Sequence, residues 1–156
     1  MTQDYYGTNR VTATKMTRLE YTQYRGWAIP SNESPEDEGY LVEYLDGGLP
    51  NHPYHTGYIT WSPKTQFEAA YQPVNALSFS HAIVALKSGL KVARAGWNGK
   101  GMWLMLVPEV LAEAISFQYA ALKPAPWIGM KTADEKFVPW LASQTDMLSD
   151  DWQIIE

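Results

Sequence analysis

The six residues Gly96-Trp97-Asn98-Gly99-Lys100-Gly101 constrain the fold more strongly than any other segment of the chain. The Asn-Gly pair is a strong signal for a tight hairpin turn, because both residues accept positive φ. Segments rich in apolar residues lie on either side of it, at residues 90–95, which also contain two basic residues, and at residues 102–107. The pattern predicts two antiparallel strands joined by these six residues, which we call the glycine turn.

Further short helices and strands are expected along the rest of the chain. Thr17 and Glu20 have the spacing of a capping box, which begins a helix. Ser62, followed by Pro63, and Ser78 are expected as N-caps of two more helices. The expected helices cover residues 18–25, 63–71, 79–87 and 108–122, and the expected strands cover 8–14, 39–45, 57–61, 90–95, 102–107, 127–131, 136–140 and 152–155. These elements predict an α+β fold of small antiparallel sheets with short helices packed against them.

A seam at residues 71–73 divides the chain into segments 1–73 and 74–156. The first segment carries 9 acidic and 5 basic side chains, and the second carries 8 acidic and 7 basic ones. No acidic residue lies between Glu68 and Glu109, where four basic residues occur. The sequence therefore predicts two small domains, the second with a locally positive stretch.

Composition excludes several classes of protein. Among the 156 residues, 46% are hydrophobic and 19% are charged, which is typical of a globular chain. The absence of Cys rules out a disulfide scaffold, a Cys-ligated zinc site and a thiol nucleophile. The net charge of −5 argues against a protein that binds DNA or RNA. No stretch is long and apolar enough to span a membrane and the start lacks a signal-peptide pattern, so we expect a soluble cytosolic protein.

The glycine turn is the first candidate binding site. Its glycines leave backbone N–H groups free to form a concave nest for an anion, to which Arg94 and Lys100 would add positive charge. Trp97 offers a flat face on which a nucleobase could stack, and Asn98 offers both a donor and an acceptor. The alternative is a tight hairpin whose tryptophan packs on the core.

The second candidate site follows Trp140. Four polar side chains come shortly after this indole, and a carboxylate with an amide is well suited to binding ribose hydroxyls. These side chains are Ser143, Gln144, Thr145 and Asp146. The alternative is a helix cap in which Ser143 or Thr145 satisfies free N–H groups. His52 and His55 are expected as loop residues, so no metal site is predicted.

Both candidate sites lie in motifs that resemble the phage Thoeris anti-defence protein two family. The resemblance covers about residues 75–156 and rests on several ungapped motifs: Phe79-Ser80-His81-Ala82, the run Val92 to Met102, Met130-Lys131-Thr132-Ala133-Asp134, the run Val138 to Leu148, and Asp151-Trp152. Segment 1–73 resembles an N-terminal extension of phage-encoded members, and its role stays unassigned.

The resemblance implies a nucleotide sponge in the cytoplasm of the host bacterium. Family members bind the cyclic ADP-ribose isomers made by TIR-domain defence proteins, such as glycocyclic ADP-ribose, and hold them uncleaved. They are α+β proteins that form homotetramers, with pockets at subunit interfaces. Some also bind cyclic di- or trinucleotides at a second site, which leaves such ligands open for this chain. No cofactor and no catalytic residue is expected.

Roles for individual residues follow from the matching motif positions. Trp97 and Trp140 would sandwich the adenine, while Asn98 and the backbone around Gly99 would meet polar ligand groups. Asp146, with Ser143 and Gln144, would contact ribose. Arg94 and Lys100 are expected as pyrophosphate partners because of their charge. Residues 108–126, expected to be largely helical, depart from many relatives and bear on ligand choice.

Two other functions stay open at this stage. One is an enzyme that hydrolyses similar nucleotides through Asp146 or through the pair Asp150 and Asp151. The other is a protein-interaction module that inhibits a host factor, with Trp27 and Trp61 as interface anchors.

Overall fold

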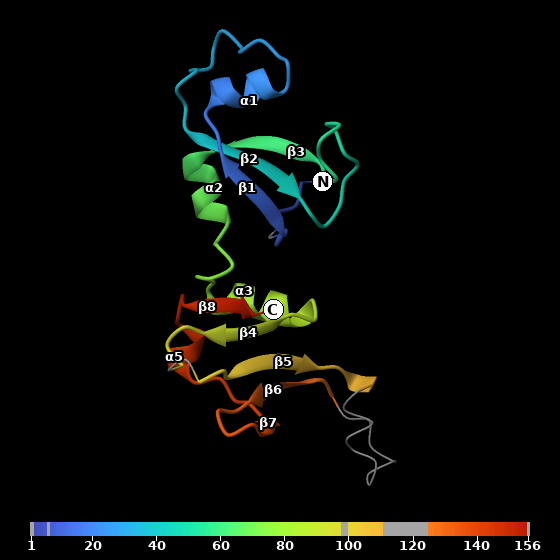
Figure 1. The fold of residues 1–156 in the computed structure, drawn as a ribbon, viewed down its shortest axis with the longest axis vertical. Helices are drawn as coiled ribbons and strands as arrows, with labels where there is room; N and C mark the ends of the chain where they lie inside the picture. Colours follow the sequence, from blue (N-terminus) through green and yellow to red (C-terminus); the bar gives the residue numbers. More distant parts are fainter. Residues whose placement is uncertain (1, 6, 98–99, 111–124, 156) are drawn as a thin grey trace. The chain divides into compact units, whose positions relative to one another are not determined.

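Two compact units make up the chain, Met1–Tyr71 (unit 1) and Gln72–Glu156 (unit 2). The computed structural model describes residues 2–5, 7–97, 100–110 and 125–155 (Figure 1). Each unit has its own antiparallel sheet and its own short helices, which confirms the α+β prediction. No helix of the described residues is both long and apolar enough to cross a membrane.

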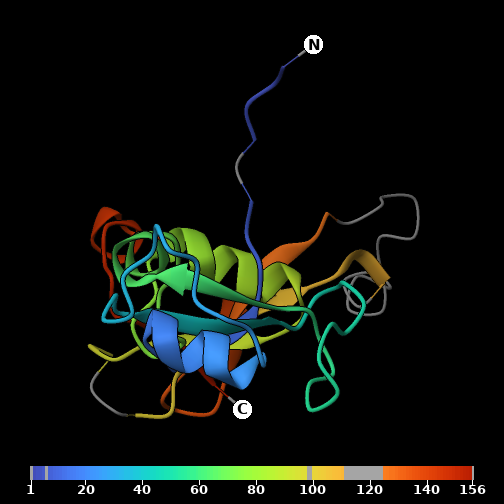
Figure 2. The same ribbon diagram turned by 90° about the horizontal axis from the view of Figure 1, so that it is seen from above.

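Unit 1 contains a three-stranded sheet in the order β1-β2-β3. Its elements are β1 (Val11–Lys15), α1 (Arg18–Tyr24), β2 (Gly39–Tyr44), β3 (Ile59–Pro63) and α2 (Lys64–Ala70). Tyr21 of α1 packs with Leu41 and Ile59 in a buried cluster, so α1 covers one face of the sheet (Figure 2). Tyr40, whose side chain points to the opposite face from Leu41, stacks on Phe67 of α2 at 4.2 Å. The two helices therefore cover opposite faces.

The start of α1 agrees with the expected capping box. Thr17 Oγ1 accepts from the Glu20 N–H at 3.2 Å, and Glu20 Oε2 accepts from the Thr17 N–H at 2.7 Å. The start of α2 differs from the prediction by one residue. Pro63, not Ser62, is the N-cap, because the pairing of Gly39 with Pro63 keeps both Ser62 and Pro63 in strand β3.

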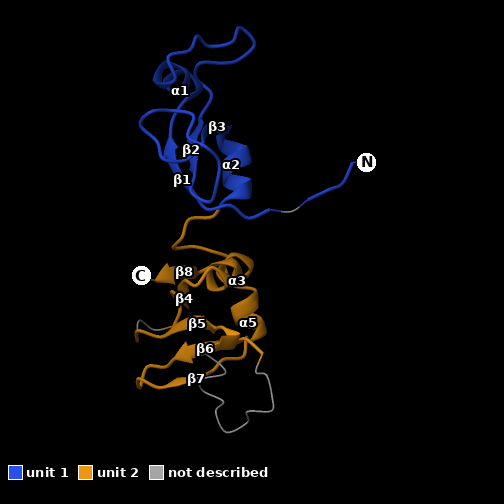
Figure 3. Cartoon of the chain, turned by 90° about the vertical axis from the view of Figure 1, so that its right-hand side faces the viewer, with its two compact units in different colours: residues 1–71 blue, residues 72–156 orange. Residues whose placement is uncertain are grey.

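Unit 2 contains a five-stranded antiparallel sheet in the order β7-β6-β5-β4-β8 (Figure 3). Its elements are α3 (Phe79–Lys87), β4 (Lys91–Arg94), β5 (Trp103–Val107), β6 (Trp127–Lys131), β7 (Phe137–Pro139), α5 (Gln144–Met147) and β8 (Trp152–Ile155). Strands β4 and β5 pair as the glycine turn predicts. Helices α3 and α5 are neighbours and lie on the same side of the sheet.

The core of unit 2 lies between α3 and the sheet. Its fully enclosed side chains come from helix α3 and from strands β4, β5 and β8, namely Ala82, Leu86, Val92, Leu104 and Trp152. Phe79 and Ile83, expected on the inner face of the helix with Leu86, pack against this cluster. Trp152 is the largest of the fully buried side chains, so the last strand anchors the core.

Several boundaries differ from the expectations. The strand expected at 8–14 begins only at Val11, where pairing with Tyr44 starts, and the strand expected at 57–61 runs from Ile59 to Pro63. Helix α5 lies in a segment for which the sequence predicts only the alternative of a helix cap at Ser143 or Thr145 and no helix range. Of the helix expected at 108–122, residues 111–124 lie outside the described residues.

Candidate functional site

The first candidate segment begins where β4 ends. Arg94 is the last residue of the strand, and its carbonyl accepts a hydrogen bond from the Trp97 N–H at 3.2 Å. This bond bends the chain so that the partly buried Trp97 turns back onto the core. Asn98 and Gly99 lie outside the described residues, and Lys100 is exposed.

The second candidate segment runs from Trp140 into α5. The Trp140 N–H donates to the Ile128 carbonyl at 2.9 Å, which holds the indole beside the sheet. Ser143 is the N-cap of α5: its Oγ accepts from the Asp146 N–H at 3.1 Å, and Asp146 Oδ2 accepts from the Ser143 N–H at 3.1 Å. The capping alternative for Ser143 is therefore present in the structure. Gln144 lies in the first turn and is exposed.

The two candidate segments meet in a cluster of aromatic rings on the core of unit 2. The ring centres of Trp97 and Trp140 lie 6.3 Å apart, and both rings contact Trp152, at 5.4 Å and 6.0 Å. Phe79 completes this group, which we call the indole cluster. The planes of Trp97 and Trp140 are inclined at 64°, so a base lying flat against both would require one indole to turn.

Charged side chains lie next to the indole cluster. Arg94 Nε donates to Asp151 Oδ1 at 2.8 Å, and Arg94 Nη1 donates to Asp146 Oδ1 at 2.9 Å. Asp151 Oδ2 also accepts from the Gly96 N–H at 2.9 Å. The structure thus places Arg94 between two carboxylates, Asp146 within α5 and Asp151 just before β8.

These contacts hold both carboxyl groups ionised. The hydrogen bonds from Arg94, together with the bond from the Gly96 N–H, place the pKa of Asp151 below its ordinary value. Burial raises the pKa of Asp146, but hydrogen bonds from Ser143 and Arg94 outweigh it, and the net pKa is lowered. Because general acid-base catalysis works best with a pKa near the working pH, neither carboxylate is suited to transfer protons at neutral pH.

The sequence does not predict Asp151 as an ion-pair partner of Arg94 at this site. Arg94 and Asp151 are 57 residues apart, and the pairing of Arg94 with Trp152 between β4 and β8 brings them together. No spacing within the sequence signals that pairing. Asp150, its neighbour, is exposed, whereas Asp151 is partly buried.

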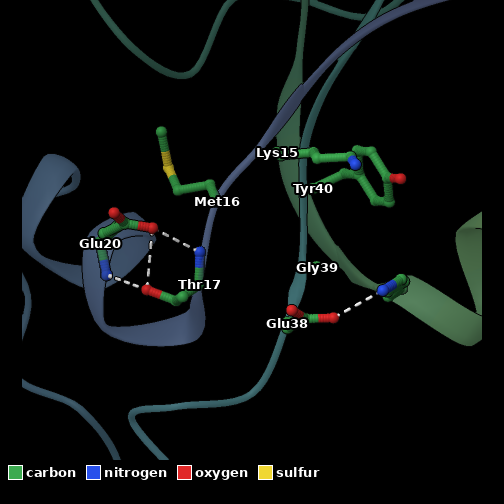
Figure 4. A pocket seen from close by; sticks show the side chains of 8 residues that line it. Lys15, Met16, Thr17, Glu20, Glu38, Gly39 and Tyr40 are labelled. Atoms are coloured by element: carbon green, nitrogen blue, oxygen red, sulfur yellow. Dashed lines mark hydrogen bonds and ion pairs between the residues drawn. The ribbon is translucent and has the colours of Figure 1, made fainter.

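Hollows on unit 1 are less suited to an anionic ligand. One of about 160 Å³ is lined by Lys15, Glu20, Glu38 and Tyr40 among others, with Glu20 bonded to Thr17 (Figure 4). Its volume is below the range of roughly 300–1,000 Å³ typical of ligand pockets. A neighbouring hollow of about 400 Å³ is lined by three carboxylates and two cations. Those cations already pair with carboxylates: Arg18 with Glu33, and Lys64 with Glu38 at 2.6 Å.

A histidine network in unit 1 also escapes prediction. His55 Nδ1 lies 2.7 Å from Glu43 Oε2, and His55 Nε2 lies 2.8 Å from the Tyr24 hydroxyl. The hydrogen bond from His55, together with those from the Gly57 and Thr56 N–H groups, lowers the pKa of Glu43 to about 2. His52 and His55 lie in the loop before β3, and the described residues contain no group of three or more His, Asp or Glu side chains that could hold a metal ion.

Comparison with known proteins places unit 2 in a family. The family described as the Thoeris anti-defense 2-like domain matches residues 77–155, just over half of the chain, and this range includes every predicted ligand-binding residue. The chain belongs to the Thoeris anti-defense 2-like family. Its domain is similar to the protein named Thoeris anti-defense 2 of Bacillus phage SP01, with 42% identity over 84 residues. That alignment covers 51% of this chain and 94% of the relative.

Proposed function

We propose that the protein is a phage anti-defence protein whose unit 2 sequesters a TIR-generated cyclic ADP-ribose isomer, such as glycocyclic ADP-ribose, without cleaving it. Sequestration would deny the Thoeris effector its activator inside the host bacterium. The observation that carries this proposal is the meeting of Trp97 and Trp140, from segments more than 40 residues apart, in one cluster within the family domain.

The indole cluster supports the binding of a nucleobase. Each stacked base is worth about 1–3 kcal/mol on an aromatic side chain. Trp97 and Trp140 are both partly exposed, whereas Trp152 beneath them is buried and supports them from the core. Either Trp97 or Trp140 would turn so that its indole lies parallel to the base. The polar neighbours of the ligand would be Asn98, the Gly99 backbone, Ser143, Gln144 and Lys100.

The electrostatics of the site favour sequestration of the nucleotide over its hydrolysis. A sponge needs tight binding of the ground state, whereas an enzyme needs interactions that strengthen in the transition state. Asp146 and Asp151, the nearest carboxylates, are both committed to Arg94 and have lowered pKa values. We therefore place sequestration ahead of hydrolysis.

Exposed apolar side chains around α5 support self-association, with a homotetramer as the proposed assembly. Leu141 and Leu148 are 91% and 81% exposed, and Met147 is 45% exposed. Neighbouring apolar groups left in water favour a protein contact. A second copy of the chain seated there would lie next to the indole cluster and would close the ligand site.

The test is capture of nucleotides from a lysate that contains an activated TIR-domain protein. The purified protein is loaded, washed and denatured by heat, and the released nucleotides are identified by mass spectrometry. We expect an intact cyclic ADP-ribose isomer in an amount no greater than that of the protein. Release of linear ADP-ribose, or turnover in excess of protein that Asp146→Asn abolishes, would establish the enzyme instead.

Two matched variants separate the site from the rest of the molecule. Trp97→Ala should lose capture, and Trp27→Ala, the same change at an exposed indole of unit 1, should retain it. Retention by both variants would refute the indole cluster as the binding site.

A protein-interaction role for unit 1 is the second candidate, and Trp27 favours it. Its indole is 53% exposed and stacks with the Arg25 guanidinium at 4.2 Å. Trp61, by contrast, is partly buried and donates from Nε1 to the Met16 carbonyl at 2.9 Å, which suits a structural role. A host protein retained by the full chain and lost with Trp27→Ala would support this role, whereas equal retention by both would exclude Trp27 as its anchor.

A further inference from the structure

A set of ion pairs joins the two tryptophan-bearing segments of unit 2. Arg94 ends β4, Asp146 lies in the first turn of α5, and Asp151 precedes β8. The two bonds from the guanidinium, at 2.8 and 2.9 Å, hold these three elements together. We call Arg94, Asp146 and Asp151 the arginine fork.

The arginine fork is well enclosed and specific in its geometry. The Arg94 and Asp146 side chains are 15% and 13% exposed, and that of Asp151 is 34% exposed. Partly buried ion pairs are screened by salt less than exposed ones. A guanidinium also presents its donors in a rigid plane, so it fixes the direction of both carboxylates in a way that a lysine cannot.

Each indole of the cluster is connected to the arginine fork. Asp151 accepts from the N–H of Gly96, the residue before Trp97, and the carbonyl of Asp146 accepts from Trp152 Nε1 at 3.0 Å. Trp140 is connected through the short segment that leads to the cap of α5. A side chain at Gly96 would bring a Cβ to 3.0 Å from Asp151 Oδ2, so the close approach of turn and carboxylate depends on this glycine.

The charge of the arginine fork argues against a direct role in phosphate binding. One guanidinium faces two ionised carboxylates, which leaves no excess positive charge for a pyrophosphate. We propose that Arg94, Asp146 and Asp151 are positioning residues, which hold the indole cluster in the arrangement that receives the ligand and do not themselves contact its phosphates. The ligand in this statement rests on the proposed function.

The test uses the full chain labelled with fluorotryptophan, with and without glycocyclic ADP-ribose. The Trp97 signal in the fluorine NMR spectrum is assigned with Trp97→Phe. Asp151→Asn removes the charge of one carboxylate, and Arg94→Lys keeps the cation but removes its planar geometry. Asp134→Asn is the matched control, because Asp134 pairs with Lys136 at 2.7 Å in an exposed turn of the same unit.

We expect Asp151→Asn and Arg94→Lys to move the Trp97 signal in the absence of ligand and to weaken nucleotide binding about tenfold, equivalent to about 1.4 kcal/mol. The signals of Trp27 and Trp61 should stay in place, which shows that the change is local. Asp134→Asn should leave both readouts unchanged. Should Asp151→Asn fail to fold, Arg94→Lys decides the question by the same two measurements.

Two results would overturn the proposal. An unchanged Trp97 signal in both variants would show that the arginine fork does not position the indole. Weak binding by Arg94→Lys with an unchanged Trp97 signal would show that Arg94 contacts the ligand directly. If the unmodified protein binds no cyclic ADP-ribose isomer, the proposed function fails, but the ligand-free spectra still decide whether the arginine fork positions Trp97.

Discussion

Trp97 and Trp152 show how the same residue type takes different roles according to its exposure. Both carry an indole and both belong to the indole cluster, but Trp152 is buried by the core whereas Trp97 is half-buried at its edge. Burial makes Trp152 a support, and partial exposure leaves Trp97 accessible to a ligand. The sequence favoured Trp152 as a core residue, and its burial confirms this interpretation. The contacts that bury it depend on the pairing of β8 with β4, which no local pattern specifies.

Replacing Trp97 with Ala should weaken binding of the cyclic ADP-ribose isomer. Loss of one stacking face predicts a decrease in binding free energy of about 1–3 kcal/mol. Isothermal titration calorimetry measures it directly, with Trp27→Ala as the variant that should bind normally. Equal affinities for Trp97→Ala and the unmodified protein would remove Trp97 from the site.

Glu43 predicts a pH dependence of the stability of unit 1. Its pKa is lowered from 4.5 to about 2 in the folded state, so its bonds stabilise the fold fully above its ordinary pKa. This contribution should be lost as the pH falls from 4.5 toward 2. Glu43→Gln lacks the titrating group, so the stability difference between it and the unmodified protein should be largest near neutral pH and should shrink on acidification.

Urea unfolding at a series of pH values, followed by circular dichroism, measures this difference. Glu36→Gln is the matched control, because Glu36 is an exposed loop residue and its replacement should leave the profile unchanged. The free energies of unfolding of Glu43→Gln and of the unmodified protein could instead differ by a constant amount from pH 7 to acidic pH. That result would contradict the assignment of the stabilisation to the ionised carboxylate.

Elements were predicted best where local chemistry decides them. The capping box at Thr17 and the antiparallel pairing of β4 with β5 follow from residues that are near one another in sequence, and both are present in the structure. The Asn98-Gly99 turn expected between these strands lies outside the described residues. The start of α2 was misplaced because a long-range contact, the pairing of Gly39 with Pro63, extends β3 beyond the local signal. Helix α5 has only four residues, too few to show an apolar period, although Ser143 and Asp146 have the spacing of a cap.

The cap of α5 provides a prediction at this scale. Ser143→Ala removes the hydroxyl that accepts from the Asp146 N–H, and loss of an N-cap costs about 0.5–2 kcal/mol. Thermal unfolding should therefore show a lower free energy of unfolding for unit 2. Ser143→Thr keeps a capping hydroxyl, so its free energy of unfolding should decrease much less. An equal decrease in both variants would show that the hydroxyl does not stabilise the helix.

At the scale of the whole molecule, the family domain and the second unit nearly coincide. The matched residues 77–155 lie entirely within unit 2, and the phage SP01 relative is covered over 94% of its length. We expect the domain to fold without unit 1, because unit 2 has its own sheet and its own core cluster. The motifs that predict the candidate site all lie in this domain, whereas the family match at residues 77–155 does not extend into unit 1.

Residues 72–156 alone should therefore fold and bind the cyclic ADP-ribose isomer. All five strands of the second sheet lie within this fragment, as do all the predicted ligand-binding residues. Calorimetry should give an affinity within a few-fold of that of the full chain, and fragment 1–71 should give none. A folded fragment 72–156 that no longer binds would show that unit 1 contributes to the site.

The position of β8 in the sheet also affects how the chain folds during synthesis. Unit 1 has all its strands within residues 11–63, so its sheet can form early, as N-terminal units do during translation. In unit 2, β8 pairs with β4, and the buried Trp152 of β8 packs in the core with side chains of α3 and β4. We therefore expect the indole cluster, and with it the proposed ligand site, to assemble only after β8 has left the ribosome.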